Sequence, residues 1–129
     1  MAAATNPGIT TLNRYFELSN TAGQNQRDLD ELLGLFARDA ELESARGEIA
    51  NGEEGLKDFF RTFFARNVEL HHVWNTEMTG PDRVRVDWAV AGRAADGHVF
   101  ALSGHDDATV DQHGHIQTLT VRPTEVRPD

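Results

Sequence analysis

The feature that most constrains the fold of this chain is a change in hydrophobic spacing after Arg66. Before Arg66, apolar residues recur three and four positions apart, as they do along amphipathic helices. After it, apolar and polar residues alternate, as they do along half-buried strands. The 129 residues suit one domain with one core. Helices followed by consecutive strands predict a single α+β domain over residues 1–129, with the helices covering one face of a curved sheet.

Three N-terminal segments carry the helical spacing: residues 8–19, 27–39 and 51–66. Asp28 is the expected N-cap of the second helix, because its short carboxylate can accept hydrogen bonds from free backbone N–H groups. Asn51 and Glu54 form a variant of the capping box at the start of the third helix. Residues 40–45 are expected to form a short edge strand between the second and third helices.

The alternating half of the chain predicts four strands, at residues 68–76, 82–93, 98–110 and 115–122. Their connections are TGPD, AADG and DQHGH, which have the composition of turns, so consecutive strands are expected to pair as antiparallel hairpins. The two ends, 1–7 and 124–129, are expected to be frayed, the second because the tail RPTEVRPD contains two prolines.

Composition excludes several classes of function. The net charge is −9, with 21 acidic and 12 basic residues, so no nucleic-acid partner is expected. The chain has no cysteine, which excludes disulfides and thiolate metal sites. The histidine pairs HH and HGH do not have metal-site spacing, and no glycine-rich phosphate cradle is present, so neither a metal nor a cofactor is expected. Without a signal-peptide pattern or a membrane-length apolar run, a cytoplasmic protein with no membrane partner is expected.

The strand 82–93 has one apolar face and one face that carries Arg85 and Asp87. With AADG as a four-residue connection, Arg85 lies opposite Asp106 on the next strand, and opposed residues share a face. This pairing predicts a cluster of Arg85, Asp87 and Asp106. The pattern leaves open whether the charged face lines a cavity or forms a salt bridge on a solvated or interface surface.

Three phrases of the sequence, LFARDAELES, NGEEGLKDFFRTFF and GHDDATVDQHGHI, resemble in order and spacing the SnoaL-like branch of the nuclear-transport-factor-2-like superfamily. The resemblance implies a cone-shaped, curved antiparallel sheet covered by three N-terminal helices around an apolar cavity. It also implies a homodimer through the outer sheet face. Members of the superfamily include ketosteroid isomerases, polyketide cyclases, limonene-type epoxide hydrolases, scytalone-type dehydratases and non-catalytic binding modules, so the fold alone does not define an activity.

The resemblance also assigns candidate residues. Asp106 matches the protonated aspartic acid of the isomerase oxyanion hole, and Tyr15 matches the tyrosine of the same hole. Arg85 and Asp87 are similar to the arginine and aspartate that limonene epoxide hydrolases place two residues apart on this strand. Scytalone-type dehydratases direct a histidine inward from this sheet, which makes His72 a candidate acid or base.

Two positions depart from these relatives. Ser44 lies near the position of the isomerase general base, and Val121 lies near that of the second aspartate of the epoxide hydrolase. Neither catalytic set is complete, so neither activity is transferred.

The resulting hypothesis is a cofactor-independent acid/base enzyme for an apolar, oxygenated small molecule resembling a polyketide or terpenoid. Asp87 and Asp106 are the expected acid/base pair, Arg85 orients them, Tyr15 donates to a developing oxyanion, and His72 is a reserve base. Cyclisation, isomerisation, dehydration and epoxide opening all use such groups. The residues expected to bind the substrate are apolar: Leu33, Phe36, Phe60, Phe64, Trp74, Phe100 and Leu102.

The alternatives are structural. The phenylalanine stripe of residues 51–66 also fits a core, and His72 also fits a hydrogen-bonded sheet histidine. A non-catalytic small-molecule-binding or dimerisation module of the same fold is the alternative function, favoured by the departures at Ser44 and Val121.

Overall fold

The computed structural model describes residues 7–124. The ends predicted to fray, 1–7 and 124–129, lie outside the described residues except for Pro7 and Thr124. Pro7 begins the first helix, and the backbone N–H of Thr124 donates to the carbonyl of Ser103 at 2.8 Å.

The described chain contains three helices and one six-stranded sheet. The elements in order are α1 (Pro7–Ser19), α2 (Gln26–Leu33), β1 (Phe36–Glu43), β2 (Ile49–Asn51), α3 (Gly52–Arg66), β3 (Asn67–Gly80), β4 (Arg83–Ala94), β5 (Val99–Val110) and β6 (Ile116–Pro123). The sheet order is β2-β1-β6-β5-β4-β3, in which β1 and β6 pair in parallel and the other neighbours pair antiparallel. The predicted α+β class is confirmed.

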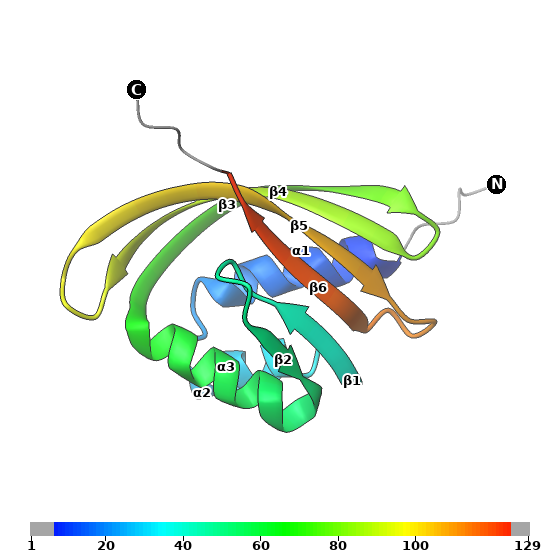
Figure 1. The fold of residues 1–129 in the computed structure, drawn as a ribbon, viewed down its shortest axis with the longest axis horizontal. Coiled ribbons are helices and arrows are strands. Elements are labelled where there is room, and N and C mark those ends of the chain that lie inside the picture. Colours follow the sequence, from blue (N-terminus) through cyan, green and yellow to red (C-terminus); the bar gives the residue numbers. More distant parts are fainter. Residues whose placement is uncertain (1–6, 125–129) are drawn as a thin grey trace.

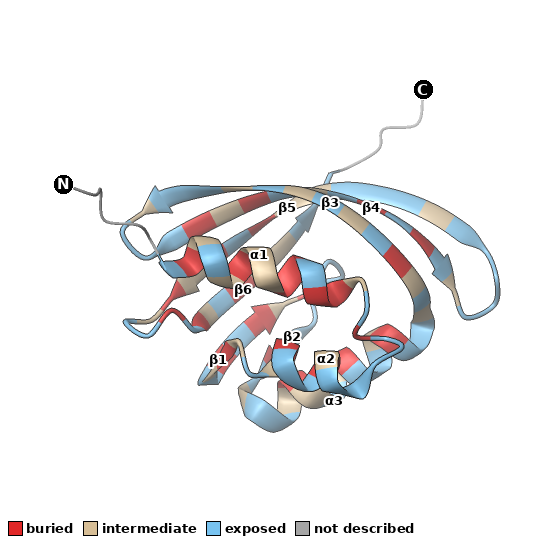
Figure 2. Ribbon diagram, turned by 180° about the vertical axis from the view of Figure 1, so that it is seen from behind, coloured by how far each residue is buried: buried red, intermediate tan, exposed pale blue. Residues whose placement is uncertain are grey.

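The long strands arch over the helices, so the sheet is strongly curved and unclosed (Figure 1). Buried and more exposed positions alternate along much of the long strands (Figure 2). One face of each strand therefore packs against the helices on the concave side, and the other face looks outward on the convex side. The core is formed by apolar side chains of both layers, and its largest fully buried members are Phe60, Leu12, Leu32, Leu42, Leu56, Ile116, Leu119, Val84 and Val86. No helix among the described residues is long and apolar enough to cross a membrane.

The predicted second helix, 27–39, is wrong in its second half. The helix ends at Leu33, and Gly34 closes it by donating its backbone N–H to the Asp30 carbonyl. The chain then continues as strand β1, where alternate residues are buried. The expected edge strand at 40–45 is therefore part of a longer strand that lies inside the sheet, between β2 and β6.

The predicted helix caps are partly wrong. Asn25, not Asp28, caps α2, because the Asn25 side chain accepts the backbone N–H of Asp28 at 3.2 Å. Asn51 does occupy the N-cap position of α3, but its side chain makes no capping hydrogen bond. The predicted capping box with Glu54 is therefore not formed from Asn51.

The predicted register between β4 and β5 is wrong by one residue. The connection has three residues, because Ala94 donates to the carbonyl of His98 at 2.9 Å and Gly97 adopts a left-handed φ of 94°. Asp106 therefore pairs with Val86, and Arg85 pairs with Asp107. A one-residue slip reverses which faces of two strands coincide. The apolar face of β4 turns inward, and its charged face turns outward.

Candidate functional site

A cavity of about 660 Å³ lies between the concave face of the sheet and helices α1 and α3. Most of its wall is apolar, as is usual for sites that bind small organic molecules. Helix α3 contributes a row of aromatic rings, because a 3.6-residue period brings positions three and four apart to one face. These rings belong to Phe59, Phe60, Phe63 and Phe64.

Asp106, on β5, is a carboxyl group in the wall of this cavity and is only 3% exposed. Its Oδ1 accepts a hydrogen bond from the indole Nε1–H of Trp88 at 2.8 Å. Burial raises the pKa of Asp106 to about 7, against the opposite effect of the Trp88 hydrogen bond. The indole occupies Oδ1, so the proton of the neutral acid is placed on Oδ2.

Tyr15, on α1, forms another part of the wall and is 8% exposed. Its ring makes edge contacts with Phe16, Phe36 and Phe60, at centroid distances of 5.2, 5.9 and 6.2 Å, which fix its orientation. Burial and the nearby Asp106 carboxylate raise the pKa of Tyr15 above its ordinary value. Tyr15 is therefore a neutral hydroxyl donor across the physiological pH range.

His72, on β3, also lines the cavity and is half-buried. Its backbone N–H and its ring Nδ1 both lie close to Oδ1 of Asn20, at 2.9 and 2.8 Å. Burial lowers the pKa of His72 to about 4, with a smaller lowering by His71. The neighbouring His71 is exposed and pairs with Glu69 on the outside of the sheet.

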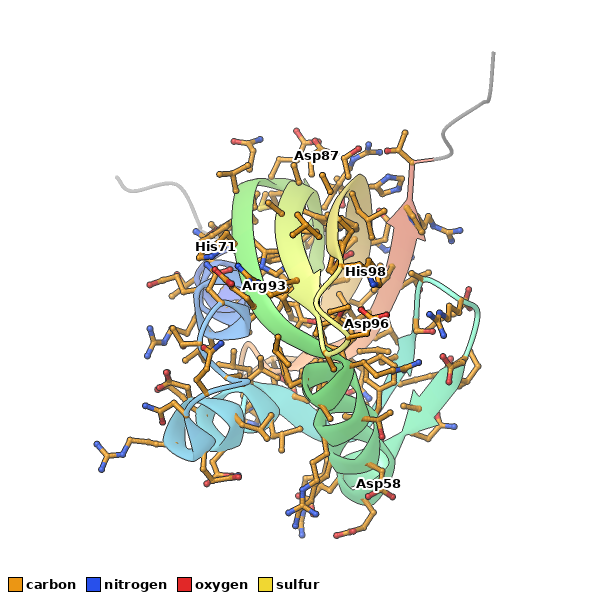
Figure 3. All side chains as sticks on the ribbon, turned by 90° about the vertical axis from the view of Figure 1, so that its left-hand side faces the viewer. Asp58, His71, Asp87, Arg93, Asp96 and His98 are labelled. Atoms are coloured by element: carbon orange, nitrogen blue, oxygen red, sulfur yellow. The ribbon has the colours of Figure 1, made fainter. Side chains whose placement is uncertain are left out.

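The mouth of the cavity is more polar than its interior. The β4–β5 turn curls towards the C-terminal end of α3 (Figure 1), and the backbone N–H of Ala95 donates to the carbonyl of Arg66 at 2.9 Å. Asp96 and His98 lie on this turn (Figure 3), where their side chains form a 2.6 Å ion-pair contact. Ser44 also lines the cavity.

Ser44, which the resemblance places near the isomerase general base, is buried and lines the cavity. Its Oγ accepts backbone N–H groups from Arg46 and Glu48, at 3.3 and 3.1 Å, and thereby shapes the β1–β2 loop. A hydroxyl in this role is a turn-forming group, not a base.

The prediction that Arg85 and Asp87 line the cavity is wrong. Both lie on the convex face, where Asp87 points away from the helices (Figure 3). The Arg85 guanidinium contacts Asp87 Oδ1 through both Nε and Nη2 at 3.1 Å, in a half-exposed ion pair. The structure therefore matches the solvated salt bridge that the sequence left open, and removes Arg85 and Asp87 from the candidate site.

The seven residues predicted to bind the substrate divide into two groups by their position in the structure. Phe60, Phe64, Phe100 and Leu102 line the cavity. The other three do not line the cavity: Phe36 belongs to the buried core, and Leu33 and Trp74 pack against that core.

Two residues that sequence reasoning missed are central to the site. Trp88 donates a hydrogen bond to Asp106, but the alternating sequence around Trp88 indicates only that Trp88 lies on an apolar face. Asn20 holds His72, although it lies in a polar segment that reads as a loop. Neither residue has a local signal, since each role depends on a partner on a distant element.

The described residues contain no group of three or more histidine, cysteine, aspartate or glutamate side chains that could hold a metal ion. The polar groups that line the cavity include the carboxyl of Asp106, the phenol of Tyr15 and the imidazole of His72. Their chemistry is proton donation and proton acceptance.

Comparison with known proteins gives a consistent result. The SnoaL-like domain family matches residues 13–118. An NTF2-like protein of unknown function from Exiguobacterium sp. 255-15 is 32% identical, with a TM-score of 0.80 over 90% of this chain and 99% of that one. No curated protein matches the sequence.

Two more distant structures share the fold. The Δ5-3-ketosteroid isomerase of a Mycobacterium species is 19% identical, with a TM-score of 0.75 over 91% of this chain and 92% of that one. A Mycobacterium tuberculosis protein solved in complex with estradiol-17β-hemisuccinate is 20% identical, with a TM-score of 0.74 over 91% of this chain and 93% of that one.

Proposed function

The chain belongs to the SnoaL-like family, which includes isomerases, cyclases and epoxide hydrolases, and from this premise we propose that it is a cofactor-independent acid/base enzyme. Its substrate is an apolar small molecule that carries a carbonyl or epoxide oxygen. The observation that carries the proposal is the buried carboxyl of Asp106, with a pKa of about 7, beside Tyr15 in the wall of an apolar cavity.

Asp106 and Tyr15 form the electrophilic end of the proposed site. Below about pH 7 both are neutral donors, Asp106 through Oδ2–H and Tyr15 through its hydroxyl. Two donors aimed at one substrate oxygen stabilise the negative charge that develops there, and they act strongly because the surroundings are apolar. This arrangement lowers the barrier to enolate formation or to epoxide opening.

His72 is the proposed base. Along β4, its pairing partner Val90 lies four positions from Val86, the partner of Asp106. That offset corresponds to ~13 Å along the strands and ~10 Å across two strand spacings. Both side chains project from a concave face and so converge, which lets one multi-atom ligand contact His72 and Asp106 together.

The proposed first step is enolisation. The neutral His72 ring takes a proton from a carbon next to the carbonyl, the C–H electron pair forms the new C=C bond, and the carbonyl π electrons move to the oxygen held by Asp106 and Tyr15. Return of the proton at another carbon gives isomerisation. Loss of a β-hydroxyl as water, with the proton supplied by the His72 imidazolium, gives dehydration. Attack of the enolate carbon on an internal electrophile gives cyclisation.

Hydrogen exchange tests this step without knowledge of the natural substrate. A panel of cyclic ketones of terpenoid and steroid size is incubated with the protein in D2O, and deuterium incorporation next to the carbonyl is followed by NMR. Wild-type protein is expected to accelerate exchange. Asp106→Ala, Tyr15→Phe and His72→Gln are each expected to slow it by about 10²–10⁴-fold.

Asp87→Asn is the matched control, because Asp87 is an exposed aspartate on the neighbouring strand. It is expected to exchange at the wild-type rate. Wild-type exchange in Asp106→Ala would contradict the proposed role of Asp106.

Ser44 favours a second candidate function, a non-catalytic binding module. A hydroxyl that caps a loop stands where the isomerase relatives are expected to have a base. In that case ketones bind without deuterium incorporation, and Asp106→Ala changes only their dissociation constants. Tight binding with no exchange across the panel would support this candidate over the enzyme.

We further propose that a second copy of the chain covers the convex face of the sheet. The small residues Ala89, Ala91 and Ala101 lie there, between Val73 and Val99, which are 70% and 73% exposed. Exposed apolar side chains grouped on one face in this way are typical of homodimer interfaces. Sedimentation velocity is expected to show a dimer, and Ala91→Asp is expected to dissociate it. A monomeric wild-type protein would contradict this arrangement.

A further inference from the structure

Asn20 follows α1 directly and connects this helix to strand β3 through a single oxygen atom. Its Oδ1 lies 2.9 Å from the backbone nitrogen of His72 and 2.8 Å from Nδ1 of the same residue. A backbone N–H can only donate, so the atom that receives it must be the amide oxygen and not the amide nitrogen. The side-chain orientation of Asn20 is therefore fixed by its partner.

The same oxygen determines the tautomer of His72. The amide oxygen has no hydrogen to offer, so a close contact with ring Nδ1 requires that Nδ1 carry the hydrogen. A neutral imidazole has only one N–H group. Nε2 of His72 therefore carries a lone pair.

Nε2 makes no hydrogen bond to any other residue in the described part of the chain, and the ring lines the cavity. The imidazole makes an edge contact with the Phe16 ring, with the ring centroids 5.5 Å apart and the ring planes at 78°. This contact fixes the tilt of the imidazole. The exposed His71 on the same strand is the charged group that acts on the ring. The other titratable residues that line the cavity are Tyr15, Arg46, Glu48, Arg66, Asp96, His98 and Asp106. The partner of Nδ1 is thus an uncharged amide.

We propose that Asn20 is a positioning residue, which holds His72 as the Nδ1–H tautomer and presents the Nε2 lone pair to the cavity as the proton acceptor. This inference rests on the proposed function in one respect, namely which substrate proton Nε2 accepts. Its structural part, the tautomer and its cause, does not depend on any substrate. A carboxylate in place of Asn20 would make a more basic imidazole, so the neutral amide keeps His72 uncharged and ready to accept a proton.

The tautomer can be measured directly in the full chain. In uniformly ¹⁵N-labelled protein at neutral pH, long-range ¹H–¹⁵N correlation spectra distinguish a protonated ring nitrogen from an unprotonated one. Comparison with His72→Gln identifies the His72 signals among those of the six histidines. We expect a protonated Nδ1 and an unprotonated Nε2. An Nε2–H tautomer in the wild-type protein would overturn the proposal.

Two substitutions test the cause. Asn20→Asp keeps an acceptor and adds a negative charge, so the Nδ1–H tautomer is retained and the titration midpoint of His72 in the NMR spectra moves to higher pH. Asn20→Leu removes the acceptor, so the Nδ1–H tautomer is lost or mixed. In a ketone exchange assay, Asn20→Leu is expected to lower kcat by about tenfold or more while KM changes less than twofold.

Asn13 supplies the matched control. Asn13 lies earlier in the chain, on α1, and its side chain also connects this helix to β3. Its Oδ1 accepts hydrogen bonds from Trp74 Nε1 at 3.1 Å and Thr76 Oγ1 at 2.6 Å. Asn13→Leu also removes two hydrogen bonds between α1 and β3. It is expected to lower the melting temperature as Asn20→Leu does, but to leave the His72 tautomer and titration midpoint unchanged.

The outcomes separate this inference from the proposed function. If Asn20→Leu leaves the His72 nitrogen shifts and titration as in the wild type, the positioning role is overturned. If the shifts respond as expected but His72→Gln exchanges ketone hydrogens at the wild-type rate, Asn20 still sets the tautomer, and the base assigned in the proposed function is the part that fails.

Discussion

At the scale of single residues, the pKa of Asp106 reflects two opposing effects, burial that raises it and the Trp88 hydrogen bond that lowers it. Trp88→Phe keeps an aromatic ring in the cavity wall but removes the N–H donor. The pKa of Asp106 is therefore expected to rise above about 7, which a ¹³C NMR titration of the carboxyl group would detect. Trp74→Phe is the control, because the Trp74 indole donates to Asn13 instead. An unchanged Asp106 titration in Trp88→Phe would contradict this account.

Gly104 makes room for the same tryptophan. A Cβ atom at this position would lie 2.5 Å from the Arg122 carbonyl oxygen, 2.8 Å from Cα of Pro123 and 2.9 Å from Cζ2 of Trp88. Two of these contacts are backbone atoms, which cannot rotate away. Gly104→Ala is expected to destabilise the protein by about 1–3 kcal/mol or more in urea denaturation. Ser103→Ala, on the exposed face, is the control and is expected to unfold close to the wild type.

The family resemblance, not the local pattern, assigned Tyr15 and Asp106 to the cavity, and Tyr15, Asp106 and His72 all line it. The partners of Asp106 and His72 were not predictable. Trp88 and Asn20 reach their partners across 18 and 52 positions of chain, and no local pattern encodes such a contact. The roles of Tyr15, Asp106 and His72 in catalysis stay predictions.

At the scale of elements, the sequence predicts the four long strands well and their register poorly. Strand positions follow from alternation, which extends over many residues. Register depends on the length of one turn, and a three-residue connection closed by Ala94 and His98 replaces the predicted four-residue one. This single difference moves Arg85 and Asp87 outward while Asp106 stays inward. The predicted length of α2 is wrong for a similar reason. Gly34 ends the helix, but the hydrophobic pattern that predicted the helix continues into β1.

The two asparagine caps provide a test at the same scale. Asn25→Ala removes the side-chain acceptor of the Asp28 N–H at the start of α2 and is expected to lower the free energy of unfolding by about 1 kcal/mol. Asn51→Ala changes the N-cap of α3, where no such hydrogen bond exists, and is expected to lower the free energy of unfolding by less than Asn25→Ala does. Chemical denaturation of both variants gives the comparison. An equal loss in the two variants would contradict the assignment of Asn25 as the functional cap.

At the scale of the whole molecule, Asp106 makes stability depend on pH. Its pKa is about 7 in the folded protein against an ordinary value of 3.8, so the folded state binds more protons between these values. Stability from this group is therefore complete below about pH 4 and is lost as pH rises through 7, by at most about 4 kcal/mol. His72 acts in the opposite sense, because its lowered pKa makes stability rise between about pH 4 and 6.5.

Replacing the acid isolates its contribution. Asp106→Asn cannot titrate, so the difference in unfolding free energy between wild type and Asp106→Asn is expected to shift against the wild type as pH rises from 5 to 8. Urea denaturation at several pH values measures this difference. The contribution of His72 to the pH dependence cancels, because both proteins contain His72. A difference that is constant with pH would show that Asp106 titrates normally in the folded protein.

The contacts that place His72 also affect how copies of this chain meet in a concentrated solution. Strand β3 is the long open border of the sheet, where unpaired backbone groups can recruit a strand from another molecule. The Asn20 side chain accepts a hydrogen bond from the backbone N–H of His72, and the Gln24 side chain donates one to the carbonyl of Val68 at 2.5 Å. Part of this sheet edge is therefore already hydrogen-bonded. At the opposite border, β2 has only three residues before α3 begins. Losing Asn20 would therefore expose a template for misassembly, and its variants should be handled with aggregation in mind.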